Sequence, residues 1–121
     1  MILVFGGAAQ GKTHFAEQLR DSYRSEGLDL PIYDLRLILP DLSKLSRQDL
    51  DSRLDYLQAE LQGQYICILE DMACGLVPMD AQERLLREFN GALLQNLAGR
   101  ASQVYRVFVG LGLCLKNEDT D

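Results

Sequence analysis

The chain begins with a short apolar run, Ile2–Phe5 (ILVF), which leads directly into GGAAQGKT, Gly6–Thr13. A continuous apolar run that stops at a glycine is typical of a strand buried on both faces of a sheet. Beyond Thr13 apolar residues recur every four positions, which predicts a helix with one face against that sheet. These residues are Phe15, Leu19 and Tyr23. The loop therefore joins a buried strand to an amphipathic helix.

The loop itself has the spacing G-x-x-x-x-G-K-[ST] of a phosphate-binding loop, or P-loop, with Gly6, Gly11, Lys12 and Thr13 at its fixed positions. Small residues let such a backbone curl, so that successive N–H groups point into one concavity at the helix N-terminus. Lys12 adds a positive charge for the β- and γ-phosphates, and the Thr13 hydroxyl is suited to ligate Mg²⁺. We predict a site for GTP or ATP with Mg²⁺, formed by Gly6, Gly7, Ala8, Ala9, Gln10, Gly11, Lys12 and Thr13.

The rest of the chain alternates predicted strands and helices. The expected strands are 1–5, 30–33, 65–69 and 104–109, with 110–116 as a short further strand, and the expected helices are 11–24, 46–62 and 80–98. Pro31 indicates that 30–33 is an edge strand, and Pro40 should break any helix within 35–45. This alternation predicts an α/β, three-layer P-loop NTPase fold with right-handed crossovers and a mainly parallel sheet of about four or five strands.

Bulk properties limit the class of protein. The chain has 121 residues, 47% of them hydrophobic, which favours one domain over residues 1–116 followed by an acidic tail, 117–121. A net charge of -6 argues against nucleic-acid binding. The first apolar run is too short for a signal peptide or a membrane span, so we expect a cytoplasmic protein. The cysteines Cys67, Cys74 and Cys114 lack metal-type spacing and are expected to be buried and reduced.

A site for a nucleoside triphosphate with Mg²⁺ usually includes a carboxylate at the end of another strand. Two positions qualify, Asp34 after LPIY and Asp71 after YICILE, the latter with Glu70 beside it. Each has a structural alternative, because an aspartate that follows a strand also caps turns and helices. His14 is the only histidine, and we expect it to be a packing or surface residue because its side chain should diverge from that of Lys12.

Three blocks of the chain resemble the adenosylcobinamide kinase/adenosylcobinamide-phosphate guanylyltransferase family of cobalamin biosynthesis. MILVFGGAAQGKTHFAEQL (1–19) resembles the family's N-terminus, and ILEDMACGLVP (68–78) is similar to its strand, acidic residue and following loop. VYRVFVGLGLCLK (104–116) resembles its last strands, with Gly112 where the family has a proline. The helix between the last two blocks agrees at Arg84, Arg87, Glu88, Gly91, Gln95, Leu97 and Ala98.

The resemblance implies a RecA-like sheet in which a further strand lies between the loop strand and the strand of the metal carboxylate. The expected order, with strands numbered along the chain, is 4-1-3-2, and 4-3-1-2 is the alternative. The same resemblance assigns Asp34 to the metal site with Thr13, and Asp71 to the later acidic position. It also implies a cobinamide-type corrinoid as a substrate.

The family carries a histidine that accepts the guanylyl group, in a segment after the first helix. This chain has no histidine there, so the resemblance does not extend to guanylyltransferase activity. Three hypotheses remain. The first is a kinase with Lys12 and Asp71 as catalytic residues, the second a nucleotide-binding paralogue or regulatory partner without phosphotransfer, and the third an unrelated P-loop ATPase that depends on assembly. The leucines of the helices exceed what a four-stranded sheet can cover, which suggests a homo-oligomer.

Overall fold

The computed structural model describes residues 1–72 and 80–118. Its elements, in chain order, are β1 (Ile2–Gly6), α1 (Lys12–Ser25), β2 (Ile32–Asp34), the 3₁₀ turn η1 (Leu35–Leu37), α2 (Leu39–Leu42), α3 (Arg47–Glu60), β3 (Ile66–Glu70), α4 (Ala81–Arg100), β4 (Gln103–Phe108) and β5 (Leu111–Asn117). The loop predicted through Gly75 and Pro78 and the thiol of Cys74 lie outside the described residues.

The strands form one sheet in the order β2-β3-β1-β4-β5. The first four run parallel, and β5 pairs antiparallel with β4. This confirms the order 4-1-3-2 and the further strand, and it rules out 4-3-1-2. The short strand β2 lies at an edge, as Pro31 indicated.

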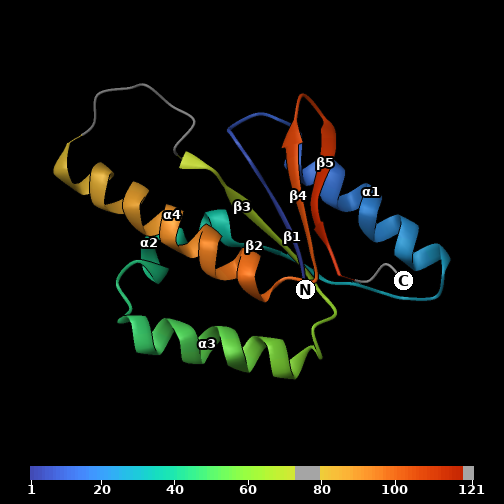
Figure 1. Cartoon of the computed structure of the whole chain (residues 1–121), viewed down its shortest axis with the longest axis horizontal. Coiled ribbons are helices and arrows are strands. Elements are labelled where there is room, and N and C mark those ends of the chain that lie inside the picture. Colours follow the sequence, from blue (N-terminus) through green and yellow to red (C-terminus); the bar gives the residue numbers. More distant parts are fainter. Residues whose placement is uncertain (73–79, 119–121) are drawn as a thin grey trace.

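Helices cover both faces of the sheet, which gives the expected α/β layering (Figure 1). On one face, Val4, Ile66 and Ile68 pack against α1 through Ala16. On the other face, the buried side chains come from β1, β3 and β4 and from the leucines of η1, α2, α3 and α4. The strands β1 and β3 are buried on both faces, which explains why their sequences are continuously apolar.

The helices begin where the sequence places their caps. Ser46 accepts a hydrogen bond from the Asp49 N–H at 3.1 Å, and Asp80 accepts one from the Glu83 N–H at 2.8 Å. The expectation for Pro40 was wrong. Pro40 lies in the first turn of the one-turn helix α2, where no intrahelical bond needs its missing N–H.

One expectation about surface residues needs correction. Cys67 is buried as predicted, but Cys114 is exposed, because it lies on the edge strand β5, none of whose residues is buried. Exposed apolar residues occur on the helices and on β5. Leu50, Leu54, Leu93 and Leu97 of the helices are buried, whereas Leu85 of α4 and Leu111, Leu113 and Leu115 of β5 are exposed. Among the described residues, no helix has the length and apolar character needed to cross a membrane.

Candidate nucleotide site

The predicted phosphate loop connects β1 to α1 at the carboxyl end of β1. Ala9 and Gly11 have positive φ angles of 56° and 87°, whereas Gln10 between them does not. Alternation of this kind turns successive N–H groups toward the same side of the backbone. Gly11 is also the N-cap of α1 and has no side chain with which to bind the first-turn amides. The loop has the backbone form that suits an anion.

Two glycines of the loop are required by close neighbours. A Cβ atom on Gly6 would lie 2.4 Å from the carbonyl oxygen of Val107 in β4, and one on Gly11 would lie 3.2 Å from Cα of Gly110. Gln10 holds the turn between β4 and β5. Its backbone oxygen accepts from the Gly110 N–H, and its side-chain oxygen accepts from the Val109 N–H, both at 2.8 Å. The loop and the hairpin turn therefore support each other.

Lys12 is buried, with 2% of its surface exposed. Its ammonium donates to the carbonyl oxygen of Gly7 within the loop, and its Nζ lies 3.8 Å from Oε1 of Glu70 at the end of β3. A buried ammonium needs such partners because desolvation disfavours its charged form. Glu70 thus acts as the counter-ion of Lys12, and the lysine ammonium is held between Gly7 of the loop and the end of β3.

Thr13 and Asp34 are brought together by Arg36, a residue that the sequence reasoning missed. Nη2 of Arg36 donates to Thr13 Oγ1 at 2.8 Å and to Asp34 Oδ2 at 2.6 Å, and Nε donates to Asp34 Oδ1 at 2.8 Å. The hydrogen bond from Arg36 lowers the pKa of Asp34 below its usual value. The only signal in the sequence was an arginine two positions after an aspartate, a pattern that also occurs in ordinary capped turns.

Asp71 lies beside the start of the loop through its backbone, because its N–H donates to the Gly6 carbonyl oxygen at 2.7 Å. The end of β3 is further fixed by Asn90, a buried residue of α4 that was also missed. The Asn90 amide donates to the Glu70 carbonyl oxygen at 2.7 Å, and its side-chain oxygen accepts from the Met72 N–H at 3.0 Å. The carboxyl end of β3 is thereby anchored to α4. His14 is exposed on α1, in agreement with a surface position.

The donor atoms near the loop fit Mg²⁺ in chemical type. Thr13 and Asp34 offer hydroxyl and carboxylate oxygens, the hard ligands that Mg²⁺ prefers. Within residues 1–72 and 80–118, no group of three or more His, Cys, Asp or Glu side chains is arranged to hold a metal ion. Mg²⁺ usually takes only one or two protein ligands and completes its shell with phosphate oxygens and water. The two oxygens are therefore sufficient for a metal that arrives with a nucleotide.

The loop, the carboxylates and the buried lysine gather at the carboxyl edge of a parallel sheet, where α/β proteins bind their ligands. A family model described as cobinamide kinase / cobinamide phosphate guanyltransferase matches residues 37–115, about two thirds of the chain. The chain belongs to this family, as the resemblance predicted. A search of curated proteins found no match to it. Membership rules out the third hypothesis, an unrelated ATPase, and the matched range begins one residue after Arg36.

Proposed function

We propose that this chain binds GTP or ATP with Mg²⁺ at residues 6–13 and transfers the γ-phosphate to a hydroxyl group of a cobinamide-type corrinoid. The observation that supports this best is the grouping of Lys12, Thr13 and Asp34, which come from two separate elements, at one end of the sheet. Family membership supports the use of a nucleotide and a corrinoid. The reaction takes place within cobalamin biosynthesis.

In this proposal the loop amides bind the phosphates and Lys12 neutralises charge that develops during transfer. The acceptor oxygen forms a bond to the γ-phosphorus while the bond from that phosphorus to its bridging oxygen breaks, and the nucleoside diphosphate leaves. Thr13 and Asp34 would hold Mg²⁺, which supplies positive charge to the phosphate oxygens. Asp71, which directly follows β3 and whose N–H binds the first residue of the loop, would accept the hydroxyl proton.

The test is a transfer assay with γ-labelled GTP or ATP, Mg²⁺ and cobinamide, in which a labelled corrinoid is sought by chromatography. We expect product with the unaltered chain and loss of at least about 100-fold in rate with Asp71→Asn, the size of a typical general-base contribution. Asp29→Asn, at an exposed carboxylate paired with Arg24 after the far end of α1, is the matched control. If nucleotide binds and no labelled corrinoid forms under any condition, the kinase proposal is refuted.

Nucleotide binding without a labelled corrinoid would favour the alternative, a nucleotide-binding paralogue or regulatory partner without phosphotransfer. One observation supports the alternative: the sole histidine, His14, is exposed on α1, and no histidine follows in the segment where the family carries its guanylyl acceptor. For the same reason we do not propose guanylyl transfer for this chain.

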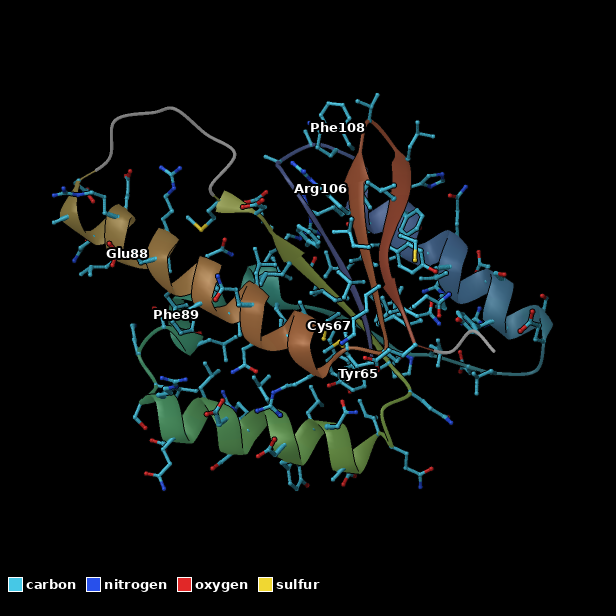
Figure 2. All side chains as sticks on the ribbon, viewed as in Figure 1. Tyr65, Cys67, Glu88, Phe89, Arg106 and Phe108 are labelled. Carbon is cyan, nitrogen blue, oxygen red and sulfur yellow. The ribbon has the colours of Figure 1, made fainter. Side chains whose placement is uncertain are left out.

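We also propose that the chain forms a homo-oligomer through the β4–β5 hairpin. Phe108, Leu111 and Leu113 are each more than 60% exposed, and Figure 2 shows Phe108 near the end of β4, above Arg106. An apolar edge strand of this kind is a common site of strand pairing or packing. Light scattering coupled to size exclusion should give a mass above 13.6 kDa, and Leu113→Asp should return it to that of one chain.

A further inference from the structure

The guanidinium of Arg36 contacts both oxygens that the sequence assigns to a metal ion. A single nitrogen, Nη2, lies 2.6 Å from Asp34 Oδ2 and 2.8 Å from Thr13 Oγ1. The Arg36 and Asp34 side chains are only 28% and 26% exposed, so their ion pair is largely shielded from water. A positive charge thus already lies between the carboxylate that ends β2 and the hydroxyl in the first turn of α1.

Arg36 and a divalent cation compete for these oxygens. Nη2 already takes one lone-pair direction on Thr13 Oγ1 and one on Asp34 Oδ2, and a cation held by the same oxygens would lie next to the guanidinium, whose positive charge repels it. Carboxylate and hydroxyl oxygens accept hydrogen bonds from a guanidinium as readily as they coordinate Mg²⁺. The two oxygens therefore have two alternative cationic partners, one of which belongs to the chain itself.

Charge at the site indicates what the arginine does. Lys12 is balanced by Glu70 and Arg36 by Asp34, so these four side chains are neutral together before any ligand binds. A triphosphate brings several negative charges, which the loop amides and Lys12 offset only in part. Arg36 is the cationic side chain beside Thr13, and its Nη2 can turn from Asp34 toward the phosphates without leaving the site.

We propose that Arg36 is a built-in substitute for the divalent cation of the nucleotide site. This inference rests on the proposed nucleotide binding at residues 6–13. Without a divalent ion, Arg36 provides positive charge beside Thr13 and supports binding of the polyphosphate. For Thr13 and Asp34 to hold a cation, the guanidinium must leave them, and this exchange reduces the gain that the metal brings.

The test compares nucleotide affinity measured by calorimetry in excess MgCl₂ and in EDTA, with non-hydrolysable analogues of GTP and ATP. The quantity compared between variants is the affinity in MgCl₂ divided by the affinity in EDTA. Arg36→Ala should weaken binding in EDTA, since a charge is lost, and should free Thr13 and Asp34 for the metal. Both effects raise the ratio, and we expect an increase of about tenfold, the value of one charge-assisted hydrogen bond. Arg36→Lys keeps the charge without the planar fork and should raise it less.

Arg24→Ala is the matched control, because Arg24 forms an exposed ion pair with Asp29 at the far end of α1. Its ratio should equal that of the unaltered chain. If both Arg36 variants also give the unaltered ratio or a smaller one, the inference is wrong, even if their affinities fall equally in the two conditions, as a merely structural role predicts. If the unaltered chain binds neither analogue in MgCl₂ or in EDTA, the proposed function itself is contradicted.

Discussion

Residues 1–36 and residues 37–115 build the same end of the sheet in different ways. The first part holds the phosphate loop, Lys12, Asp34 and Arg36, and it lies outside the range matched by the family model. The second part holds the end of β3 and the hairpin, which hydrogen-bond to the loop, and α4, which anchors the end of β3. Family membership thus rests on residues 37–115, whereas the proposed nucleotide site lies mainly in residues 1–36, and phosphate transfer needs both parts because Asp71 lies in the second. Substitutions in the first part should accordingly affect nucleotide affinity most, and those in the second part should affect stability or, at Asp71, the transfer rate.

The largest effect is expected at Lys12, in the first part. Lys12→Ala should weaken nucleotide binding by about 2–4 kcal/mol, since a charge-assisted contact to phosphate is lost at a partly buried site. Calorimetry with GTP and ATP measures this, and circular dichroism checks that the variant is folded. His14→Ala, two positions along the same helix and exposed, is the control and should leave affinity unchanged. If folded Lys12→Ala binds GTP and ATP as tightly as the unaltered chain, the assignment of the nucleotide site is refuted.

The next largest effect is a loss of stability, and it is expected in residues 37–115. Asn90→Ala should lower the free energy of unfolding by about 1–3 kcal/mol, because the Glu70 carbonyl oxygen and the Met72 N–H both lose a buried partner. Urea denaturation measures the loss, and Gln95→Ala, at an exposed position of the same helix, should change it little. If Asn90→Ala reduces nucleotide affinity and leaves the free energy of unfolding unchanged, the different roles assigned to residues 1–36 and 37–115 are contradicted.

A smaller effect concerns the dependence of stability on acid. The folded-state pKa of Asp34 is lowered by the hydrogen bond from Arg36, so the pair stabilises the folded chain above the ordinary aspartate pKa of about 4. This contribution is lost as pH falls through the lowered folded-state pKa. Asp34→Asn should therefore be less stable than the unaltered chain at neutral pH, and the gap should narrow below about pH 4. Thermal unfolding followed across that range is the measurement. If the difference in stability between Asp34→Asn and the unaltered chain is the same at every pH, the ion pair does not stabilise the folded chain.

The smallest effect concerns the reactivity of the cysteine thiols and requires no change in stability. In a Cys74→Ser background, iodoacetamide should label exposed Cys114 and leave Cys67 unmodified. Burial raises the pKa of the Cys67 thiol to about 12, so little thiolate is present near neutral pH, and the thiolate is the reacting form. Peptide mass analysis distinguishes the two positions. Equal labelling of both thiols in the folded chain would show that the sheet opens at β3.

The sequence was most informative where apolar periodicity or backbone spacing decides the structure. The buried runs of β1 and β3 and the stripe of Phe15, Leu19 and Tyr23 predicted the layers, and the family resemblance supplied the strand order. The sequence was less informative where a polar side chain meets a distant partner. Nothing in the pattern around Arg36 or Asn90 indicates that the first reaches Thr13 or that the second ties β3 to α4. Such contacts depend on tertiary geometry, and the exposure of Cys114 likewise follows from its strand being last in the sheet.

The turn at Val109 and Gly110 has a practical consequence for protein engineering. Hairpin tips usually accept epitope tags and short insertions. Here both residues have positive φ, an uncommon conformation for a β-branched valine, and both N–H groups are bound by Gln10 of the phosphate loop. A tag inserted at this tip would therefore detach the loop from its support, and reagents for detection or immobilisation belong on the exposed face of α3 instead.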